Sequence, residues 1–386
     1  MLSQGLVQRG HQVSVITAVP HYPSGRVPVE YHGKWMWRSC ENGVNVTRVG
    51  LPSVKRKSLI QRLLQFLSFQ IGATVAGFNQ QYDVVIVANP ALQVWLPFTW
   101  TVTLRRKPAI FSIHDVYPDV GVTLGIFKHK AQIAFIARLE KYCLDHATHI
   151  RILSDSFRTG LKNLNVPESK MSLIYDWVDT NLIHPLPSEN LFSQEHDLND
   201  YFVALYAGNI GLSQGLENIV NAAKLLTDQQ DIKFVFVGDG SGKESLKSYV
   251  SQKQLQNISF IPFQPREKLP EVLASADISI VMLKHGIGAT SLPSKILSIM
   301  ASGRPIIISV DDESEAWKLI RRADAGIWVP PENPSRLAKA ILALKQDKAL
   351  RNQLGKNGRI WAEKHHSPQI AAGQFEKLLI NALHAN

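Results

Sequence analysis

The feature that most limits the fold of this sequence is the alternation of short apolar runs with longer amphipathic segments along almost its whole length. Apolar and β-branched composition predicts strands in the first half at 13–17, 44–49, 84–87, 109–113, 149–153 and 172–174, and in the second half at 202–206, 234–237, 258–260, 278–281, 306–308 and 326–329. Helical periodicity is found between them at 130–147, 215–227, 243–254, 267–275 and 314–323, and again from 334 onward. Strands that alternate with helices form parallel sheets covered on both faces, so the sequence predicts doubly wound α/β domains.

The length of the chain and one connecting segment predict how these domains are divided. A chain of 386 residues is too long for one hydrophobic core. The segment 176–190 is rich in Pro, Asp and Asn, which is typical of a linker between domains. We therefore expect one Rossmann-like domain at 1–182 and a second at 183–362, with a cleft between them. A final helix at 363–386 is expected to pack back toward the first domain.

The beginning of the chain does not follow the usual order of a doubly wound domain. Such a sheet normally starts with a central strand and a glycine-rich turn, but this sequence opens on a helix at 1–8. Loss of a central strand would leave buried backbone groups unpaired. We expect one strand-plus-turn unit to be missing from the start, with a rearranged sheet as the alternative.

Charge and cysteine content limit the classes of partner. Lys and Arg number 42 against 32 Asp and Glu, a formal net charge of +10, which suits phosphorylated ligands or an acidic membrane surface. Nucleic acid is not expected, because the basic residues are scattered and no recognition-helix pattern accompanies them. No apolar run approaches the roughly 18 residues that a membrane-spanning helix needs. Cys40 and Cys143 match no metal or redox spacing, which fits a reducing cytoplasm.

The densest basic patch, Lys55-Arg56-Lys57, comes just before an apolar helix predicted at 59–69. The polar residues of that helix, Arg62 among them, lie opposite its leucines. A basic patch beside an apolar helix is typical of a segment that docks on anionic lipid. A core helix packed on a sheet is the alternative, because both have the same periodicity. In the first interpretation, these four basic residues contact the membrane.

One helix start has the composition of an anion-binding site. Pro293-Ser294-Lys295 opens a predicted helix that ends near Gly303, before the strand at 306–308. A helix that begins with a hydroxyl and a lysine presents backbone N–H groups and positive charge to an anion. A helix cap without a ligand is the alternative, because serine is common there. The first interpretation places the phosphates of a nucleotide-linked substrate at Ser294 and Lys295.

This segment belongs to a set of motifs that are individually modest and jointly specific. They are LVQRGHQVSVIT (6–17), SIHDVYPD (112–119), LIYDWVDT (173–180), YAGNIGLSQGL (206–216), VFVGDGSGK (235–243), FIPFQPREKLP (260–270), PSKILSIMASGRPIIIS (293–309) and AGIWVPPENP (325–334). Together they resemble the family 4 glycosyltransferases, which have the two-domain GT-B fold. Within that family the sequence is most similar to enzymes of bacterial exopolysaccharide, colanic acid and O-antigen assembly.

The resemblance implies which residues contact the sugar donor. They are Gly208, Asn209, Gly211, Gln214, Gly238, Asp239, Pro262, Phe263, Thr290, Ser294, Lys295 and Ser298. Many relatives have an arginine and a lysine at the positions of Asn209 and Gln214, and two glutamates at those of Thr290 and Ser298. Without these charges, phosphate binding falls to the start of the helix at Lys295.

The resemblance also implies catalytic residues in the first domain. His114 and Asp115 follow the apolar strand at 109–113, where ligands of such sheets bind. An imidazole at His114 would face the donor sugar and stabilise developing charge. Asp115 would orient the acceptor or polarise its hydroxyl. An ordinary strand-end cap is the alternative.

The implied function is transfer of a hexose or deoxyhexose from a nucleoside diphosphate sugar to a hydroxyl of a growing glycan, one linked to polyprenyl diphosphate. The resemblance implies retention of the anomeric configuration, no tightly held metal, no cofactor besides the nucleotide-sugar substrate, and a peripheral place on the cytoplasmic face of the cell membrane. Two alternatives remain open. A non-catalytic sugar- or nucleotide-binding homologue would explain the missing glutamates, and a GT-B-type sugar-nucleotide epimerase would need an acid/base pair that the sequence does not identify.

Overall fold

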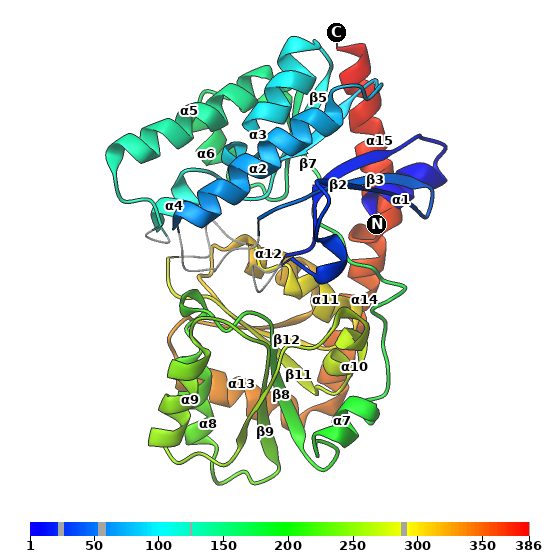
Figure 1. The fold of residues 1–386 in the computed structure, drawn as a ribbon. Helices are drawn as coiled ribbons and strands as arrows, with labels where there is room; N and C mark the ends of the chain where they lie inside the picture. The colour runs from blue at the N-terminus through cyan, green and yellow to red at the C-terminus, as the bar shows by residue number, and fades with distance from the viewer. Residues whose placement is uncertain (22–26, 53–58, 124–125, 287–291, 386) are drawn as a thin grey trace. The chain divides into compact units, whose positions relative to one another are not determined.

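The computed structural model describes residues 1–21, 27–52, 59–123, 126–286 and 292–385. The chain forms two compact units (Figure 1). Unit 1 consists of Met1–Tyr175 together with Ala371–Asn386, and unit 2 is the continuous stretch Asp176–Ile370.

Unit 2 is built, in its described part, on one six-stranded parallel sheet in the order β10-β9-β8-β11-β12-β13. The strands are β8 (Phe202–Ala207), β9 (Ile232–Val237), β10 (Ile258–Ile261), β11 (Ile278–Met282), β12 (Ile306–Ser309) and β13 (Gly326–Val329). All six were expected from the sequence. The order runs outward from β8 in one direction and from β11 in the other, so the two neighbouring strands mark the switch point where doubly wound sheets bind ligands.

Successive residues of each strand point to opposite faces of this sheet, so both faces carry apolar side chains. Helices cover both faces. They are α7 (Leu191–Glu195), α8 (Glu217–Leu225), α9 (Lys243–Gln252), α10 (Leu269–Ala274), α11 (Lys295–Ala301), α12 (Glu315–Ala323), α13 (Pro334–Gln346) and α14 (Lys348–His365). On β8, Leu205 belongs to the core formed with α10, α11 and α12, whereas Tyr206 belongs to the core formed with α8, α9 and α13.

Unit 1 contains two sheets among its described residues. One has the order β1-β3-β2 and the other the order β4-β5-β6-β7. The strands are β1 (Ser14–Ala18), β2 (Met36–Glu41), β3 (Val44–Val49), β4 (Val85–Ala88), β5 (Ala109–Ile113), β6 (His149–Ile152) and β7 (Met171–Leu173). The helices are α1 (Leu2–Gln8), α2 (Leu59–Gly77), α3 (Ala91–Phe98) with a π-helical continuation at Thr99–Leu104, α4 (Asp119–Thr123), α5 (Lys130–His146), α6 (Phe157–Asn163) and α15 (Pro368–His384), whose residues from Ala371 onward belong to this unit.

Strand β2 was not expected from the sequence, and it is antiparallel to β3. The two strands are joined at Asn42 and Gly43, which have φ angles of 51° and 80°. Positive φ at both central residues is the requirement of a type I′ hairpin turn, and Asn-Gly is its strongest sequence signal. The dipeptide was therefore the available evidence for β2.

Helix α2 presents apolar side chains to solvent and buries polar ones. Leu63 and Leu67 are 61% and 46% exposed. In contrast, Gln65 is buried and donates to the carbonyl of Pro52 at 2.9 Å, and the Gln70 amide bonds the backbone of α3. These leucines are therefore exposed, whereas another face of α2 packs on β1 and β3, where Ala73 and Ala76 are buried.

The last helix is held to the start of the chain by charge pairs within unit 1. Glu376 on α15 accepts hydrogen bonds from Arg9, which follows α1, at 2.7 Å and lies 2.8 Å from the ring of His11. These contacts join segments that are 367 and 365 residues apart in the sequence.

Candidate functional site

Unit 2 gathers its loops at the carboxyl ends of β8 and β11. The loop after β8 carries Gly208 and Asn209, and the segment after β11 leads to α11. The two loops touch, because the backbone N–H of Lys284 donates to the carbonyl of Ser213 at 3.0 Å. The switch point of the sheet is therefore bounded by these two loops and by the first residue of α11.

Lys295, the first residue of α11, extends its side chain back to the end of β8. The ammonium Nζ lies 3.7 Å from the ring centroid of Tyr206, which is itself buried. A Cβ placed on Gly208 would lie 3.5 Å from this Nζ, so the turn after β8 borders the amine directly. The sequence had suggested Gly208 and Lys295 as separate donor residues, and the fold brings them together.

The amine of Lys295 is shielded from solvent and has no hydrogen-bond partner among the described residues. Burial lowers its pKa to about 7, because the charged form loses its hydration. The face of an aromatic ring compensates only in part for that loss. A bound anion would supply the missing hydrogen bonds and restore the charge, so the arrangement suits a phosphate ligand.

Two glycine turns pack against each other beside this amine. Gly238, after β9, has a φ of 146°, and a Cβ there would lie 2.0 Å from the carbonyl oxygen of Gly208. Glycine is therefore required by the contact between the two loops. Gln214 accepts the backbone N–H of Gly211 at 3.1 Å, so its side chain closes its own loop. The side chain of Asn209 is exposed.

The other residues that the sequence suggested as contacts of the sugar donor follow strands of the same sheet, belong to the start of α11, or lie outside the described residues. Asp239 is exposed and accepts the N–H of Gly240 at 2.8 Å. Pro262 and Phe263 follow β10, and Phe263 presents an exposed ring. The remaining three are Ser294, which precedes α11 and is exposed, Ser298, which is half-buried within α11, and Thr290, which lies outside the described residues.

In unit 1 the residues suggested as catalytic form a turn after β5. The side chain of Asn89, which follows β4, forms hydrogen bonds with the backbone of both residues. Its Oδ1 accepts the backbone N–H of His114 at 2.8 Å, and its Nδ2 donates to the carbonyl of Asp115 at 2.6 Å. The His114 side chain is exposed, and burial raises the pKa of the half-buried Asp115 carboxyl. The sequence suggested His114 and Asp115 but not Asn89.

Glu140 is a second residue that the sequence did not suggest. It lies on α5, is 2% exposed, and accepts the backbone N–H of Ala91, the first residue of α3, at 2.9 Å. Burial raises its pKa to about 7. Burial and the charges of Asp115 and Glu140 also raise the pKa of Tyr117. Glu140 therefore belongs to the electrostatic surroundings of the turn after β5.

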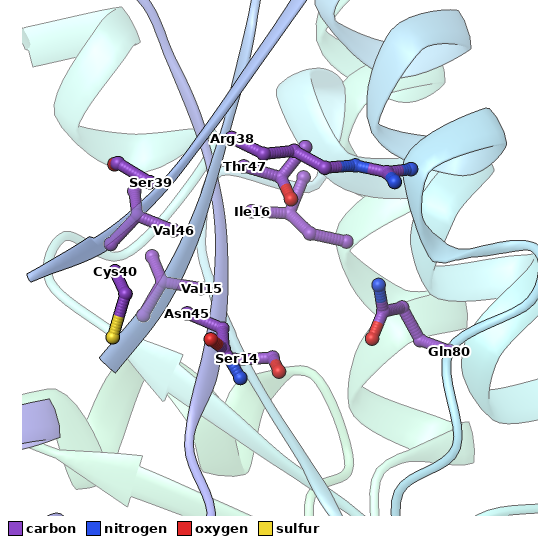
Figure 2. A pocket seen from close by; sticks show the side chains of 10 residues that line it. All are labelled: Ser14, Val15, Ile16, Arg38, Ser39, Cys40, Asn45, Val46, Thr47 and Gln80. Atoms are coloured by element: carbon purple, nitrogen blue, oxygen red, sulfur yellow. The ribbon is translucent and has the colours of Figure 1, made fainter. Parts of the chain in front are cut away.

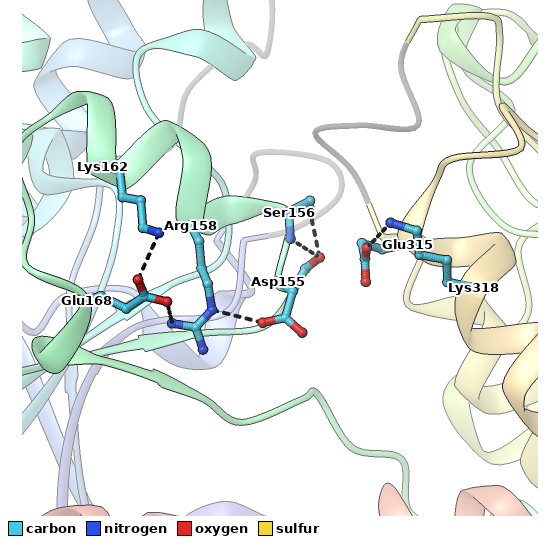
Figure 3. Close-up of polar contacts among 8 residues, drawn as sticks. Asp155, Ser156, Arg158, Lys162, Glu168, Glu315 and Lys318 are labelled. Atoms are coloured by element: carbon cyan, nitrogen blue, oxygen red, sulfur yellow. Dashed lines mark hydrogen bonds and ion pairs between the residues drawn. The ribbon is translucent and has the colours of Figure 1, made fainter.

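Other charged residues near strand ends are already paired within their own unit (Figure 3). In unit 1, Arg158 bonds Asp155 at 2.9 Å, and Lys162 pairs with Glu168 at 2.8 Å. In unit 2, Glu315 pairs with Lys318 at 2.8 Å. Also in unit 2, Nδ1 of His285 lies 2.5 Å from Oδ1 of Asp311. Because these groups already have polar partners, they are weaker candidates for ligand binding than Lys295.

A cavity of about 380 Å³ lies elsewhere in unit 1, along β1 and its neighbours. Figure 2 shows side chains of all three strands of that sheet on one side and Gln80, between α2 and β4, on the other. None of the residues suggested by the sequence lines it, so it is separate from the turn that carries His114.

The membrane-contact residues suggested by the sequence cannot be placed. Lys55, Arg56 and Lys57 lie outside the described residues, and so does the side chain of Arg62. The described part of α2 contributes its exposed apolar side chains instead. No helix of the described chain is both long and apolar enough to cross a bilayer.

Two family models match this chain in succession. The model described as Glycosyltransferase Family 4 matches residues 1–182, and the model described as Glycosyl transferases group 1 matches residues 188–361. Between them, the matches extend over nearly the whole chain.

Curated relatives and solved structures agree with these matches. The chain is 28% identical over 347 residues to WcaI of Escherichia coli K12, named as a colanic acid biosynthesis glycosyl transferase, with 87% of this chain and 84% of that protein covered. It is 27% identical to a glycosyltransferase named WbjE of Pseudomonas aeruginosa, with 75% and 73% covered. Among solved structures, sucrose-phosphate synthase from Thermosynechococcus elongatus has a TM-score of 0.76 at 19% identity, with 100% and 92% covered. Anabaena HepE in complex with UDP-glucose has a TM-score of 0.72 at 14% identity, with 96% and 100% covered. The fold is thus that of GT-B glycosyltransferases.

Proposed function

Because this chain belongs to the family 4, group 1 glycosyltransferases, we propose that it transfers a sugar from a nucleoside diphosphate sugar to a glycan in bacterial cell-surface polysaccharide synthesis. The observation that carries the donor half of this proposal is the buried amine of Lys295, which lacks a hydrogen-bond partner among the described residues. The polysaccharide context comes from relatives named for colanic acid and capsular polysaccharide biosynthesis.

In this proposal, unit 2 binds the donor at the carboxyl ends of β8 and β11. The diphosphate is bound by the Lys295 ammonium, with the Ser294 hydroxyl as a further hydrogen-bond donor. The exposed ring of Phe263 borders the nucleotide base. As the bond to the sugar breaks, negative charge grows on the departing nucleotide, and a cation fixed beforehand stabilises it. Lys295 supplies that charge from the protein itself, so we propose a metal-independent reaction.

Unit 1 supplies the acceptor side in this proposal. His114 is assigned to hydrogen bonding with the donor sugar, and Asp115 to orientation of the attacking hydroxyl. Burial raises the pKa of Asp115, so this carboxyl holds a proton more readily than an exposed aspartate. Retention of configuration is proposed from the resemblance to the family.

We also propose that α2 places the enzyme on a membrane, where a lipid-linked glycan acceptor is available. Its exposed apolar stripe consists of Leu63, Leu64, Leu67, Ile71 and Val75, and Phe78 continues it just beyond the end of the helix. Six exposed apolar side chains on one helix and its end are typical of a helix that lies in a lipid interface. The basic sequence Lys55-Arg56-Lys57 precedes the helix and favours anionic lipid. This would make the protein peripheral on the cytoplasmic face of the membrane.

The experiment that tests the function is a donor and acceptor screen on the purified chain. Nucleotide-sugar donors are first screened for binding by thermal shift, and those that bind are then incubated with membrane glycolipid acceptors. Release of nucleoside diphosphate that requires acceptor, together with labelled sugar in the glycolipid, supports transfer. Donor binding without turnover would identify a non-catalytic homologue, and conversion of the donor to a second nucleotide sugar without acceptor would identify an epimerase.

A further inference from the structure

Unit 1 contains a second cavity, of about 340 Å³, between the segment that precedes β2, the end of β3 and helix α2. Tyr31, His32, Lys34 and Trp35 line it from the first of these segments, and Ser68 lines it from α2. A volume of this size is within the range of small-molecule sites. None of the residues assigned to the donor or to the turn after β5 lines it, so the cavity is a separate candidate site.

Trp35 gives this cavity an aromatic wall that is open to solvent. The chain has eight tryptophans, all of them among the described residues, and Trp35 is the one that is exposed, at 52%. An indole has a large apolar surface, and leaving it in water forgoes the free energy of burial. An exposed ring of this kind beside a cavity indicates a ligand with an apolar face.

The backbone that carries Trp35 is fixed before any ligand binds. The carbonyl of Trp35 accepts the N–H of Gly50, just after β3, at 2.8 Å. The ring of Tyr31, which lines the same cavity, packs edge-on against Trp37 with the ring centroids 5.5 Å apart. A preorganised wall lowers the entropy that a ligand loses on binding.

Hydrogen-bonding groups surround this aromatic wall. The described lining residues include Lys34, His32 and Ser68, and no aspartate or glutamate. Nε2 of His32 donates to the carbonyl of Val27 at 3.0 Å, so this ring is also held in place. A sugar ring has one face of C–H groups and a rim of hydroxyls. It therefore matches an aromatic surface bordered by donors and acceptors.

Helix α2 forms one side of the cavity. Ser68 lines the cavity directly, and Gln65 donates to the carbonyl of Pro52, another lining residue, at 2.9 Å. The exposed leucines that we assign to a lipid interface belong to the same helix. A glycan attached to a membrane lipid would therefore be presented beside this cavity.

We propose that the cavity binds one sugar ring of the acceptor glycan, stacked on the indole of Trp35. Lys34, His32 and Ser68 then contact the hydroxyls of that ring. The identification of the sugar as part of the acceptor rests on the proposed function, whereas the binding of a sugar ring does not.

Sugar binding is measured on the purified chain by NMR, from the indole ¹⁵N–¹H signal of Trp35, which Trp35→Phe identifies. The probes are the methyl glycosides of glucose, galactose, fucose and glucuronic acid, titrated one at a time. At least one of them is expected to shift the Trp35 signal in a saturable manner. No saturable shift with any of the four would overturn the proposal. A Trp35 signal that moves only with phospholipid vesicles would overturn it as well, because the ring would then belong to the lipid interface.

Variants show whether the glycoside binds at this ring. Saturation-transfer NMR measures the affinity of each variant for the glycoside, and Trp35→Ala should bind about tenfold more weakly because stacking is lost. Trp35→Phe retains an aromatic face and should lose less. Phe135→Ala removes a ring that is 56% exposed on α5, outside the cavity, and should bind normally. Equal affinity in Trp35→Ala and Phe135→Ala would contradict the proposal.

Kinetics test the assignment to the acceptor once a donor and an acceptor are known. Trp35→Ala should raise the KM for the acceptor about tenfold and leave the KM for the donor unchanged. An unchanged KM for the acceptor would exclude the acceptor from this cavity even if glycosides bind there. If the unaltered protein transfers no sugar, the proposed function fails, while the glycoside titration still decides whether the cavity binds a sugar.

Discussion

The ammonium of Lys295 lies over the ring of Tyr206, 3.7 Å from the ring centroid, at the end of strand β8. The two residues are 89 positions apart in the sequence and meet because β8 and β11 are neighbours in the sheet. The ring shields the amine from water, and the Tyr206 hydroxyl donates to the carbonyl of Asn209 at 2.8 Å. Tyr206 thus both covers the lysine and fixes the loop beside it.

Replacement of Lys295 should weaken donor binding. Lys295→Ala is expected to reduce the affinity for a nucleoside diphosphate by about 1–3 kcal/mol, the cost of losing a charged hydrogen bond. Isothermal calorimetry on folded protein provides the measurement. Lys339→Ala, on the exposed face of α13, is the control and should bind normally. Equal affinity in the two variants would exclude Lys295 from the donor site.

Donor binding should take up a proton above neutral pH. The pKa of Lys295 is about 7 without ligand, and a bound diphosphate favours the charged form and raises it. Affinity should therefore fall as the pH rises above about 7, by up to about tenfold per pH unit until the pKa of the complex is reached. Calorimetry at pH 8 in buffers with different ionisation enthalpies measures the proton uptake directly. Lys295→Ala should abolish it, and uptake that persists in this variant would assign the proton to another group.

The apolar stripe of α2 should control attachment to lipid. Leu63→Ser combined with Leu67→Ser is expected to reduce co-sedimentation with anionic phospholipid vesicles, because two exposed leucines lose their transfer free energy into the interface. Ile360→Ser removes a half-exposed apolar side chain from α14 and should have little effect. Equal binding of the unaltered protein to neutral and anionic vesicles would contradict the electrostatic part of the proposal.

Two glycines with positive φ should respond differently to alanine. Gly238→Ala places a Cβ 2.0 Å from the Gly208 carbonyl, whereas the Cβ of Gly286→Ala meets nothing within 4 Å. Both variants place alanine at a positive φ, which costs on the order of 1–3 kcal/mol, but only the first also displaces a neighbouring loop. Urea unfolding should therefore show the lower midpoint for Gly238→Ala, and donor affinity should fall with it. Similar midpoints would mean that the turns at Gly208 and Gly238 can move apart without lowering the free energy of unfolding.

The buried carboxyl of Glu140 should make unit 1 less stable as the pH rises. Its pKa increases from the usual 4.5 to about 7 on folding, so the folded state binds more protons between these values. The contribution of Glu140 to the free energy of unfolding is fully present below about pH 4.5 and is lost as the pH rises through 7. The total loss is about 3 kcal/mol. Glu140→Gln keeps an acceptor for the Ala91 N–H without the charge. Its urea midpoint should therefore exceed that of the unaltered protein at pH 8 but not at pH 5, and the same difference at both values would contradict a buried ionising group.

The sequence by itself determined the predicted strands and the class of the fold. Runs such as Ile306–Ile308 and Ile278–Val281 are β-branched and lie between helical segments, and local composition of this kind is sufficient to place a strand. It also singled out Lys295, Gly208, His114 and Asp115 as candidate site residues. Strand β2 was the exception, although its Asn42-Gly43 turn was visible in the sequence.

Only the tertiary structure decided which side chains meet and which faces are buried. Distant elements meet in three of these contacts, and no local pattern encodes them. They are the contact of Tyr206 with Lys295, the hydrogen bonds of Asn89 to the His114 turn, and the hydrogen bond of Glu140 to α3. The orientation of α2 is of the same kind, because an apolar face has the same periodicity whether it packs on a sheet or remains exposed. A sequence pattern fixes the local backbone, whereas burial and the pKa values that follow from it are set by the packing of the whole unit.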